Sequence, residues 1–122
     1  MHKEDKMNYF KKANELYNAK EYQKAISMYE RALKVNENES SSLYNTAVCH
    51  IKLKNYKKAV GFLKNAINLK RDSKYIFNLG YCYAMLNDNP KALYHFNLAW
   101  SINNDDKDCE KAINLILDNY ID

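Results

Sequence analysis

Two sets of alanines recur along the chain at intervals of 34 and then 33 residues. The members are Ala25, Ala59 and Ala92 in the first set, and Ala32, Ala66 and Ala99 in the second. A period near 34 residues is typical of proteins built from stacked helix pairs, because each pair buries its apolar face only against its neighbours. The spacing therefore predicts an all-α repeat protein with three helix pairs.

The composition agrees with this architecture. The 122 residues suffice for one domain, and the 47% that are hydrophobic suffice for a core, which repeats spread along a line. Only two Gly and one Pro are present to interrupt helices. We expect an N-terminal tail over residues 1–5, repeats over residues 6–39, 40–72 and 73–106, and a final helix over residues 107–122.

Small residues also recur in the first helix of each repeat, at Ala13, Ala47 and Gly80. Each is expected to face an alanine of the second helix. Two facing small residues let helix axes approach toward the short end of the usual range of about 8–10 Å. Close contact between the two helices of each repeat is therefore predicted.

Polar residues at the expected helix starts predict the caps. Asn89 is the predicted cap of a helix that has Pro90 at its first position, where a missing N–H does no harm. The first helices of repeats two and three have four candidate caps. These are Ser40, Ser41, Asp72 and Ser73.

Repeat three carries the most complete motif, made of Ile76, Leu79, Gly80, Tyr83, Ala92, Phe96 and Ala99. This order of a large residue, Leu-Gly, Tyr, Ala, an aromatic residue and Ala resembles the tetratricopeptide repeat (TPR). The resemblance covers about residues 6–106 and implies a right-handed superhelix with the first helices on its inner side. Residues 107–122 resemble the family's capping helix, and Trp100 is expected to pack beneath it. The predicted apolar stripe of this helix consists of Cys109, Ala112, Ile113, Ile116, Leu117 and Tyr120.

The resemblance implies a peptide-binding groove lined by the first helices. Its predicted residues form columns across the repeats: Phe10, Lys11, Asn14, Tyr44, Asn45, Val48, Lys74, Phe77, Asn78 and Tyr81. Met7 and Ser41 share the column of Lys74. Amides can pair with the backbone of an extended peptide, and aromatic rings can take its apolar side chains. We therefore predict a non-catalytic adaptor that binds a protein or peptide partner.

A sharper comparison is with the carboxylate clamp by which some co-chaperones of the family hold the acidic C-terminal tail of heat-shock chaperones. Asn14, Asn45 and Lys74 fall on three of its five positions. Phe10 replaces a lysine and Asn78 replaces an arginine, so two of three cations are missing and bidentate capture of a carboxylate is lost. We favour a groove for a neutral or mildly acidic peptide, with the clamp as the alternative.

The positive charge of the chain is modest and comes almost entirely from lysine. The net charge is +4, Arg31 and Arg71 are the two arginines, and the sequence pI is about 8.8. Repeat two is the most basic, with Lys52, Lys54, Lys57, Lys58, Lys64, Lys70 and Arg71. Proteins that bind nucleic acid usually have a pI above about 9 and arginine in the binding stripe. A solvated lysine face is therefore favoured over a nucleic-acid site.

Catalytic and metal-binding patterns are missing from the sequence. The histidines, which are His2, His50 and His95, are scattered, and there is no phosphate-binding glycine loop or nucleophile elbow. Cys49 and Cys82 occupy equivalent positions about one helix spacing apart, which exceeds the ~7 Å that a disulfide permits. These two and Cys109 are predicted to be reduced packing thiols. We expect no catalysis, cofactor or metal.

The sequence also bears on location and assembly. No segment is apolar for long enough to cross a membrane, and the first residues lack the apolar stretch of a signal peptide. We therefore expect a cytoplasmic protein without membrane insertion. A monomer or weak homo-oligomer is expected, with self-association through an edge of the stack as an alternative function.

Overall fold

A computed structural model describes the backbone of residues 8–121 and the side chains of residues 8–118. The predicted tail over residues 1–5, and Met7, lie outside the described residues. Within them the chain forms seven α-helices and no strand. The helices are α1 (Tyr9–Asn18), α2 (Tyr22–Lys34), α3 (Glu39–Lys52), α4 (Tyr56–Leu69), α5 (Ser73–Met85), α6 (Asn89–Ile102) and α7 (Lys107–Ile121).

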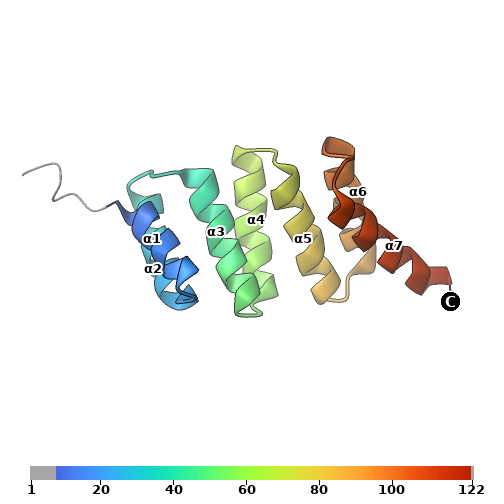
Figure 1. The fold of residues 1–122 in the computed structure, drawn as a ribbon, viewed down its shortest axis with the longest axis horizontal. Helices are drawn as coiled ribbons and strands as arrows, with labels where there is room; N and C mark the ends of the chain where they lie inside the picture. The colour runs from blue at the N-terminus through green and yellow to red at the C-terminus, as the bar shows by residue number, and fades with distance from the viewer. Residues whose placement is uncertain (1–7, 122) are drawn as a thin grey trace, which may run out of the picture.

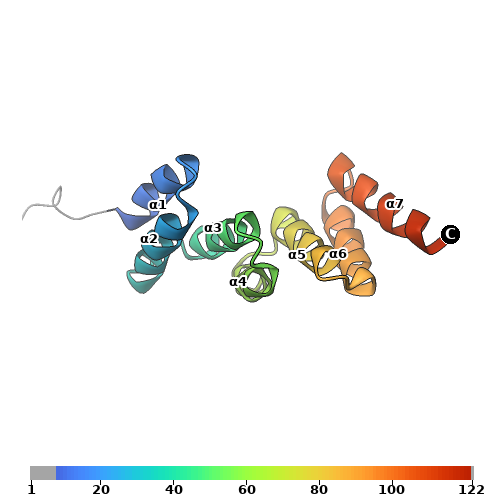
Figure 2. The ribbon, with the colours of Figure 1, turned by 90° about the horizontal axis from the view of Figure 1, so that it is seen from below.

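The helices stand in a row in which each one packs on the next along the chain (Figure 1). The row is curved: α1 and α7, at its two ends, rise toward the side on which α3 lies, and α4 lies on the opposite side (Figure 2). The predicted all-α superhelix of three helix pairs and a final helix is confirmed. No helix of the described residues is long and apolar enough to span a bilayer.

Both alanine sets lie in the core, as predicted. All six side chains are fully buried, and so are Ala13 and Ala47 of the first helices. Gly80 shows how little room there is between the helices of repeat three. A Cβ at this position would lie 2.8 Å from two ring carbons of Phe96 and 3.2 Å from the carbonyl oxygen of Ala92. Gly80 therefore marks a close helix contact in repeat three, and buried alanines occupy its position in repeats one and two.

The turns inside the three repeats have the same backbone conformation. Lys20, Lys54 and Asn87 have left-handed φ angles of 62°, 63° and 63°. In each turn, the N–H of this residue and the N–H of the next donate to carbonyl groups of the preceding helix, which satisfies the end of that helix. Figure 1 shows all three turns along one edge of the molecule. The turns are therefore structurally equivalent and can be compared position by position.

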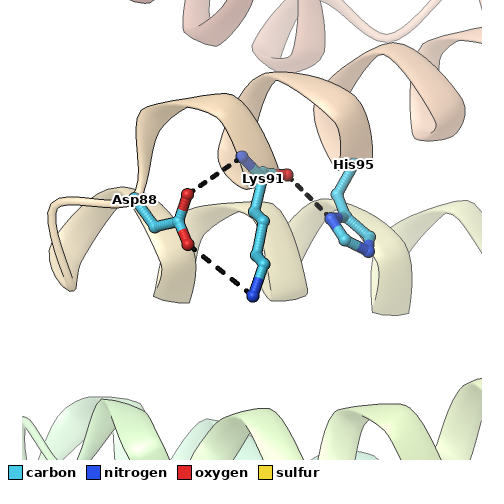
Figure 3. Close-up of polar contacts among 3 residues, drawn as sticks. All are labelled: Asp88, Lys91 and His95. Carbon is cyan, nitrogen blue, oxygen red and sulfur yellow. Dashed lines mark hydrogen bonds and ion pairs between the residues drawn. The ribbon is translucent and has the colours of Figure 1, made fainter.

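The cap of α6 differs from the prediction. Asp88 is the N-cap, and its Oδ1 accepts the N–H of Lys91 at 3.2 Å (Figure 3). Asn89, the predicted cap, is the first helical residue, and Pro90 lies in the first turn. The prediction was wrong by one residue because the side chain of Asp88 is the one whose oxygen reaches a free N–H of the helix.

The predicted caps of the first helices are correct for α5 and wrong for α3. Asp72 caps α5, with its Oδ1 accepting the N–H of Lys74 at 2.8 Å, and Ser73 is the first helical residue. Ser40 and Ser41 do not cap α3. The helix already begins at Glu39, and its N-cap is Asn38, which has a left-handed φ of 46° and makes no side-chain cap bond. Asp72 is thus the one confirmed cap among the four candidates.

The final helix covers part of the last repeat. Cys109 and Ile116 of α7 are buried, as the helical stripe predicts. Leu117, which was predicted on the same stripe, is 41% exposed, and Leu115 is 67% exposed. Trp100 of α6 is 40% exposed, so it packs beneath α7 only in part. The predicted position of Tyr120 on this stripe lies outside the described side chains.

The two glycines lie in helices with opposite surroundings, which gives a paired test of the close contact. Gly80→Ala should destabilise the fold by about 1–2 kcal/mol, because overpacking against Phe96 outweighs the gain in helix propensity. Gly61→Ala should stabilise it by up to about 1 kcal/mol, since a Cβ there meets nothing within 4 Å. Urea denaturation of both variants measures the difference. Equal effects of the two substitutions would contradict the close contact.

Candidate functional site

A hollow of about 360 Å³ opens between the first helices of repeats one and two. Its lining residues come from α1, α2 and α3, and they are Asn14, Tyr17, Asn18, Tyr29, Tyr44, Asn45 and Val48. Tyr29 is fully buried and forms the floor. Four residues of the predicted groove therefore lie together here: Asn14, Tyr44, Asn45 and Val48. The curvature of the stack places α1 and α3 on its inner side (Figure 2).

A chain of polar contacts crosses the hollow from repeat one to repeat two. The hydroxyl of Tyr29 donates to Oδ1 of Asn14, and Nδ2 of Asn45 donates to the same oxygen at 3.3 Å. Burial, followed by the neighbouring Cys49 thiol, raises the pKa of Tyr29 to about 12, so this hydroxyl stays protonated as a donor. Neither bond uses Nδ2 of Asn14 or Oδ1 of Asn45. The pair can therefore offer a ligand one amide donor and one amide acceptor.

Tyr44 connects this hollow to repeat three. Its ring stacks on Tyr75 of α5 with centroids 4.5 Å apart, and its hydroxyl accepts Nδ2 of Asn78 at 3.1 Å. Nδ2 of Asn78 also donates to the carbonyl oxygen of Lys74 at 2.9 Å. The Nζ of Lys74 lies 5.2 Å from the centre of the Tyr44 ring, a cation–π distance. Burial raises the pKa of Tyr44 to about 12. Tyr44, Lys74 and Asn78 therefore form one group.

Phe10 and Phe77 take the position of Tyr44 in repeats one and three, and their rings pack on second helices. Phe10 lies 6.0 Å from Tyr29 of α2, and Phe77 lies 5.1 Å from Phe96 of α6, measured between ring centroids. Both phenylalanines are half-buried. They contribute to packing between first and second helices, so each offers a ligand only part of its ring.

Two further predicted residues lie apart from the hollow. Lys11 is exposed on the first turn of α1 and is not among the lining side chains. Tyr81, near the end of α5, packs against Tyr56 at the start of α4, with ring centroids 6.3 Å apart. Neither residue lines the hollow that contains the amide pair.

The sequence interpretation missed three lining residues. Tyr17 and Asn18 follow Asn14 by three and four positions, so the same helical face continued by one turn would have included them. Tyr29 occupies the position of Leu63 and Phe96 in the other repeats, which are core positions. Only the structure shows that its hydroxyl reaches the groove.

Comparison with known proteins identifies the family. The family model described as anaphase-promoting complex, cyclosome, subunit 3 matches residues 1–66 and, in a second alignment, residues 18–99. The chain belongs to this family of TPR proteins. The interpretation of the repeat motif as a TPR is therefore confirmed.

Curated relatives of this TPR chain are much longer. The Hsp70-Hsp90 organising protein of Plasmodium falciparum (isolate 3D7) is 33% identical over 87 residues, which is 71% of this chain and 15% of that protein. The BBSome complex member BBS4 of Bos taurus is 32% identical over 81 residues, which is 66% of this chain and 16% of that protein. The chain thus spans only about one sixth of the length of these relatives.

Solved structures agree on the TPR fold. The first TPR of Spaghetti (RPAP3), bound to the HSP90 peptide SRMEEVD, has a TM-score of 0.88 and 16% identity, over 93% of this chain and 91% of that one. The TPR domain of Arabidopsis OM64 has a TM-score of 0.86 and 20% identity, over 91% and 93%. The high TM-scores establish a shared fold, and at such low identities they establish nothing further.

His50 takes the position that Tyr83 holds in repeat three, and it lies in the core. Its side chain is 7% exposed, and its ring stacks on Phe62 at 5.4 Å between centroids. Its Nδ1 has no hydrogen-bond partner among the described residues. Burial, reinforced by the nearby Lys58 charge, lowers the pKa of His50, while Glu30 opposes the shift. The imidazole is therefore held neutral in the folded TPR stack.

This neutral imidazole predicts a pH-dependent stability. Because the pKa of His50 is lower in the folded state than in the unfolded state, the unfolded chain binds the proton more strongly. The stability that the neutral imidazole contributes to the folded state is complete above the unfolded pKa of about 6.5. It is lost as the pH falls toward the folded pKa. Urea denaturation between about pH 7.5 and pH 5 should show this loss.

A matched pair of variants isolates the effect. His50→Tyr, which installs the residue of the equivalent position in repeat three, should flatten the loss of stability, whereas His95→Gln should leave it in place. An unchanged pH profile in His50→Tyr would contradict the assignment.

Proposed function

We propose that this chain is a non-catalytic adaptor that binds a segment of a partner protein in the concave groove. The observation that carries the proposal is the amide pair of Asn14 and Asn45 at the edge of a hollow between α1 and α3. The pair is anchored from below by the buried hydroxyl of Tyr29. Anchored amides keep their orientation without a ligand, which lowers the entropy lost on binding.

The chemistry of the hollow suits an extended peptide. A peptide backbone presents N–H and C=O groups that need partners when they leave water. The unused Nδ2 of Asn14 and the Oδ1 of Asn45 complement a backbone C=O and N–H, whatever the side chains of the ligand. Tyr17, Tyr44 and Val48 supply apolar surface around the pair. The hollow therefore favours recognition of the backbone with a modest preference for apolar side chains.

Charge in the groove favours a neutral or mildly acidic segment. Lys74 supplies one cation, which lies over the ring of Tyr44. At the arginine position of the clamp stands Asn78, whose Nδ2 already donates to Tyr44 and to a backbone carbonyl. At the position of the first clamp lysine stands Phe10, whose ring packs on Tyr29. A terminal carboxylate would meet one lysine where the clamp provides three cations.

An acidic chaperone tail is the second candidate ligand, and the comparisons favour it. One similar structure holds the HSP90 peptide SRMEEVD, and one curated relative is an Hsp70-Hsp90 organising protein. Lys74 and both amides of the clamp are present here. We therefore place this tail second, as a weak ligand of the same groove.

We propose that the chain binds the segment without catalysing a reaction of it. Its curated TPR relatives are an organising protein, a member of the BBSome complex and a subunit of the anaphase-promoting complex, which fits a role in protein assembly. A cytoplasmic location fits a co-chaperone-like role.

Self-association through the partly covered end of the stack is the third alternative, since Leu115 and Leu117 of α7 are exposed. A light-scattering mass measurement distinguishes a monomer from an oligomer.

Two substitutions distinguish recognition of the peptide backbone from capture of a carboxylate. With SRMEEVD as the probe, Asn45→Ala should reduce affinity by about 1–3 kcal/mol, because it leaves a ligand backbone group unpaired. Lys74→Ala should reduce it by about 1 kcal/mol or less, as one solvent-exposed charge does. Isothermal titration calorimetry measures both. Asn65→Ala, an exposed asparagine of α4, is the control that should bind like the unmodified chain.

The reverse order of effects would overturn this preference. Tight binding of SRMEEVD that Lys74→Ala abolishes would establish the carboxylate clamp. Binding that neither substitution alters would place the ligand outside the concave groove.

A further inference from the structure

A second hollow lies on the edge of the stack that carries the turns. It has a volume of about 320 Å³ and is formed mainly by the turn of repeat two and the start of α4. Its lining residues are Lys54, Asn55, Tyr56, Lys57, Lys58 and Leu86. Leu86 comes from the turn of repeat three, so the hollow joins two repeats. Leu86 directly follows the last residue of α5, whereas Lys74 lies in the first turn of that helix, so the hollow and Lys74 are at opposite ends of α5.

The equivalent turns of the other repeats hold an internal carboxylate. In repeat one, Glu21 pairs with Lys24 at 3.9 Å. In repeat three, Asp88 pairs with Lys91 at 3.8 Å, as Figure 3 shows. The same two positions in repeat two are Asn55 and Lys58, so the lysine is retained and the acid is replaced by an amide. The described ion pairs between residues 8 and 118 involve none of Lys54, Lys57 and Lys58.

The hollow therefore concentrates positive charge beside an apolar wall. Three lysines lie close together without a carboxylate contact. An anionic ligand would reduce the repulsion among their charges. Leu86 and the half-buried Tyr56 form the apolar side, and the ring of Tyr56 packs against Tyr81. Proteins that bind nucleic-acid strands present exposed rings on which bases stack, and they favour arginine. Lysines beside a small apolar wall suit a ligand that carries carboxylates next to a small apolar side chain.

We propose that this basic hollow docks an acidic segment of a partner protein, with a carboxylate close to the place that Glu21 and Asp88 fill in their own repeats. An apolar side chain of the segment contacts Leu86 and Tyr56. This site is separate from the concave groove, and the proposal stands whether or not a peptide binds there. A partner can thus engage the concave face and the turn edge of the stack at the same time.

A titration followed by amide NMR locates the site. The probe is the acidic peptide EELEDLEE, with QQLQNLQQ as its uncharged counterpart, at low ionic strength. Saturable shifts are expected for the amides of residues 54–58 and 86 with the acidic peptide, and none with the uncharged one. Raised salt should weaken the binding, because exposed charges are screened.

The repeats supply matched variants. Lys54→Gln combined with Lys58→Gln should weaken binding by about fivefold, as expected for two exposed charge contacts. Lys20→Gln combined with Lys24→Gln changes the same turn positions and the same charge in repeat one, and should leave affinity unchanged. Asn55→Asp restores the carboxylate of the other repeats and should weaken binding by about threefold.

Three results would overturn the proposal. Equal losses of affinity in the two double lysine variants would mean that overall charge, and not this hollow, attracts the peptide. Loss of binding in Lys74→Ala would place the acidic peptide in the concave groove. A short oligouridine that displaces the peptide at lower concentration would indicate a nucleic-acid site.

Discussion

The close approach of the two helices in each repeat is the contact on which the rest of the structure depends. Eight fully buried alanines and Gly80 remove side-chain bulk where the helices meet. The larger side chains beside them, such as Tyr29, Leu63 and Phe96, then fill the space between the helices. Because each repeat has this geometry, stacking three of them produces one curved row. The stack thus needs no core at a common centre.

The candidate groove follows from this geometry. Close packing brings Tyr29 of α2 near enough to α1 for its hydroxyl to reach Asn14, and stacking brings Asn45 of the next repeat to the same oxygen. The inner surface therefore has ordered amides because the outer helices hold them in place. Tyr44 plays a similar part between repeats two and three, through its stacking on Tyr75 and its bond with Asn78.

The fold could be predicted from the sequence because its signals are periodic. The alanines recur at the repeat period and report on helix contact, and Gly80 occupies the position of Ala13 and Ala47. Positions that depend on one local geometry were harder. Asp88 and Asn89 are both good capping residues, and only the reach of one carboxylate decides between them. Leu117 lies next to Ile116 on α7, yet the two side chains differ in burial because they lie about 100° apart around the helix.

Features that join different repeats were the least visible in the sequence. Tyr29 occupies a core position, so nothing in its spacing marks a hydroxyl that reaches the groove. The basic hollow depends on Leu86 from a different turn and on an acid that repeat two lacks. A row of lysines alone predicts a solvated face, and the arrangement becomes informative only when the three turns are compared in space.

The central claim is that the amide pair of Asn14 and Asn45 contacts a bound peptide backbone. The most direct measurement follows the side-chain NH₂ signals of the asparagines by NMR during titration with SRMEEVD. The account predicts saturable shifts for Asn14 and Asn45 and a stationary signal for Asn65. Peptide binding that leaves both groove asparagines unmoved, while signals of the outer helices shift, would contradict it.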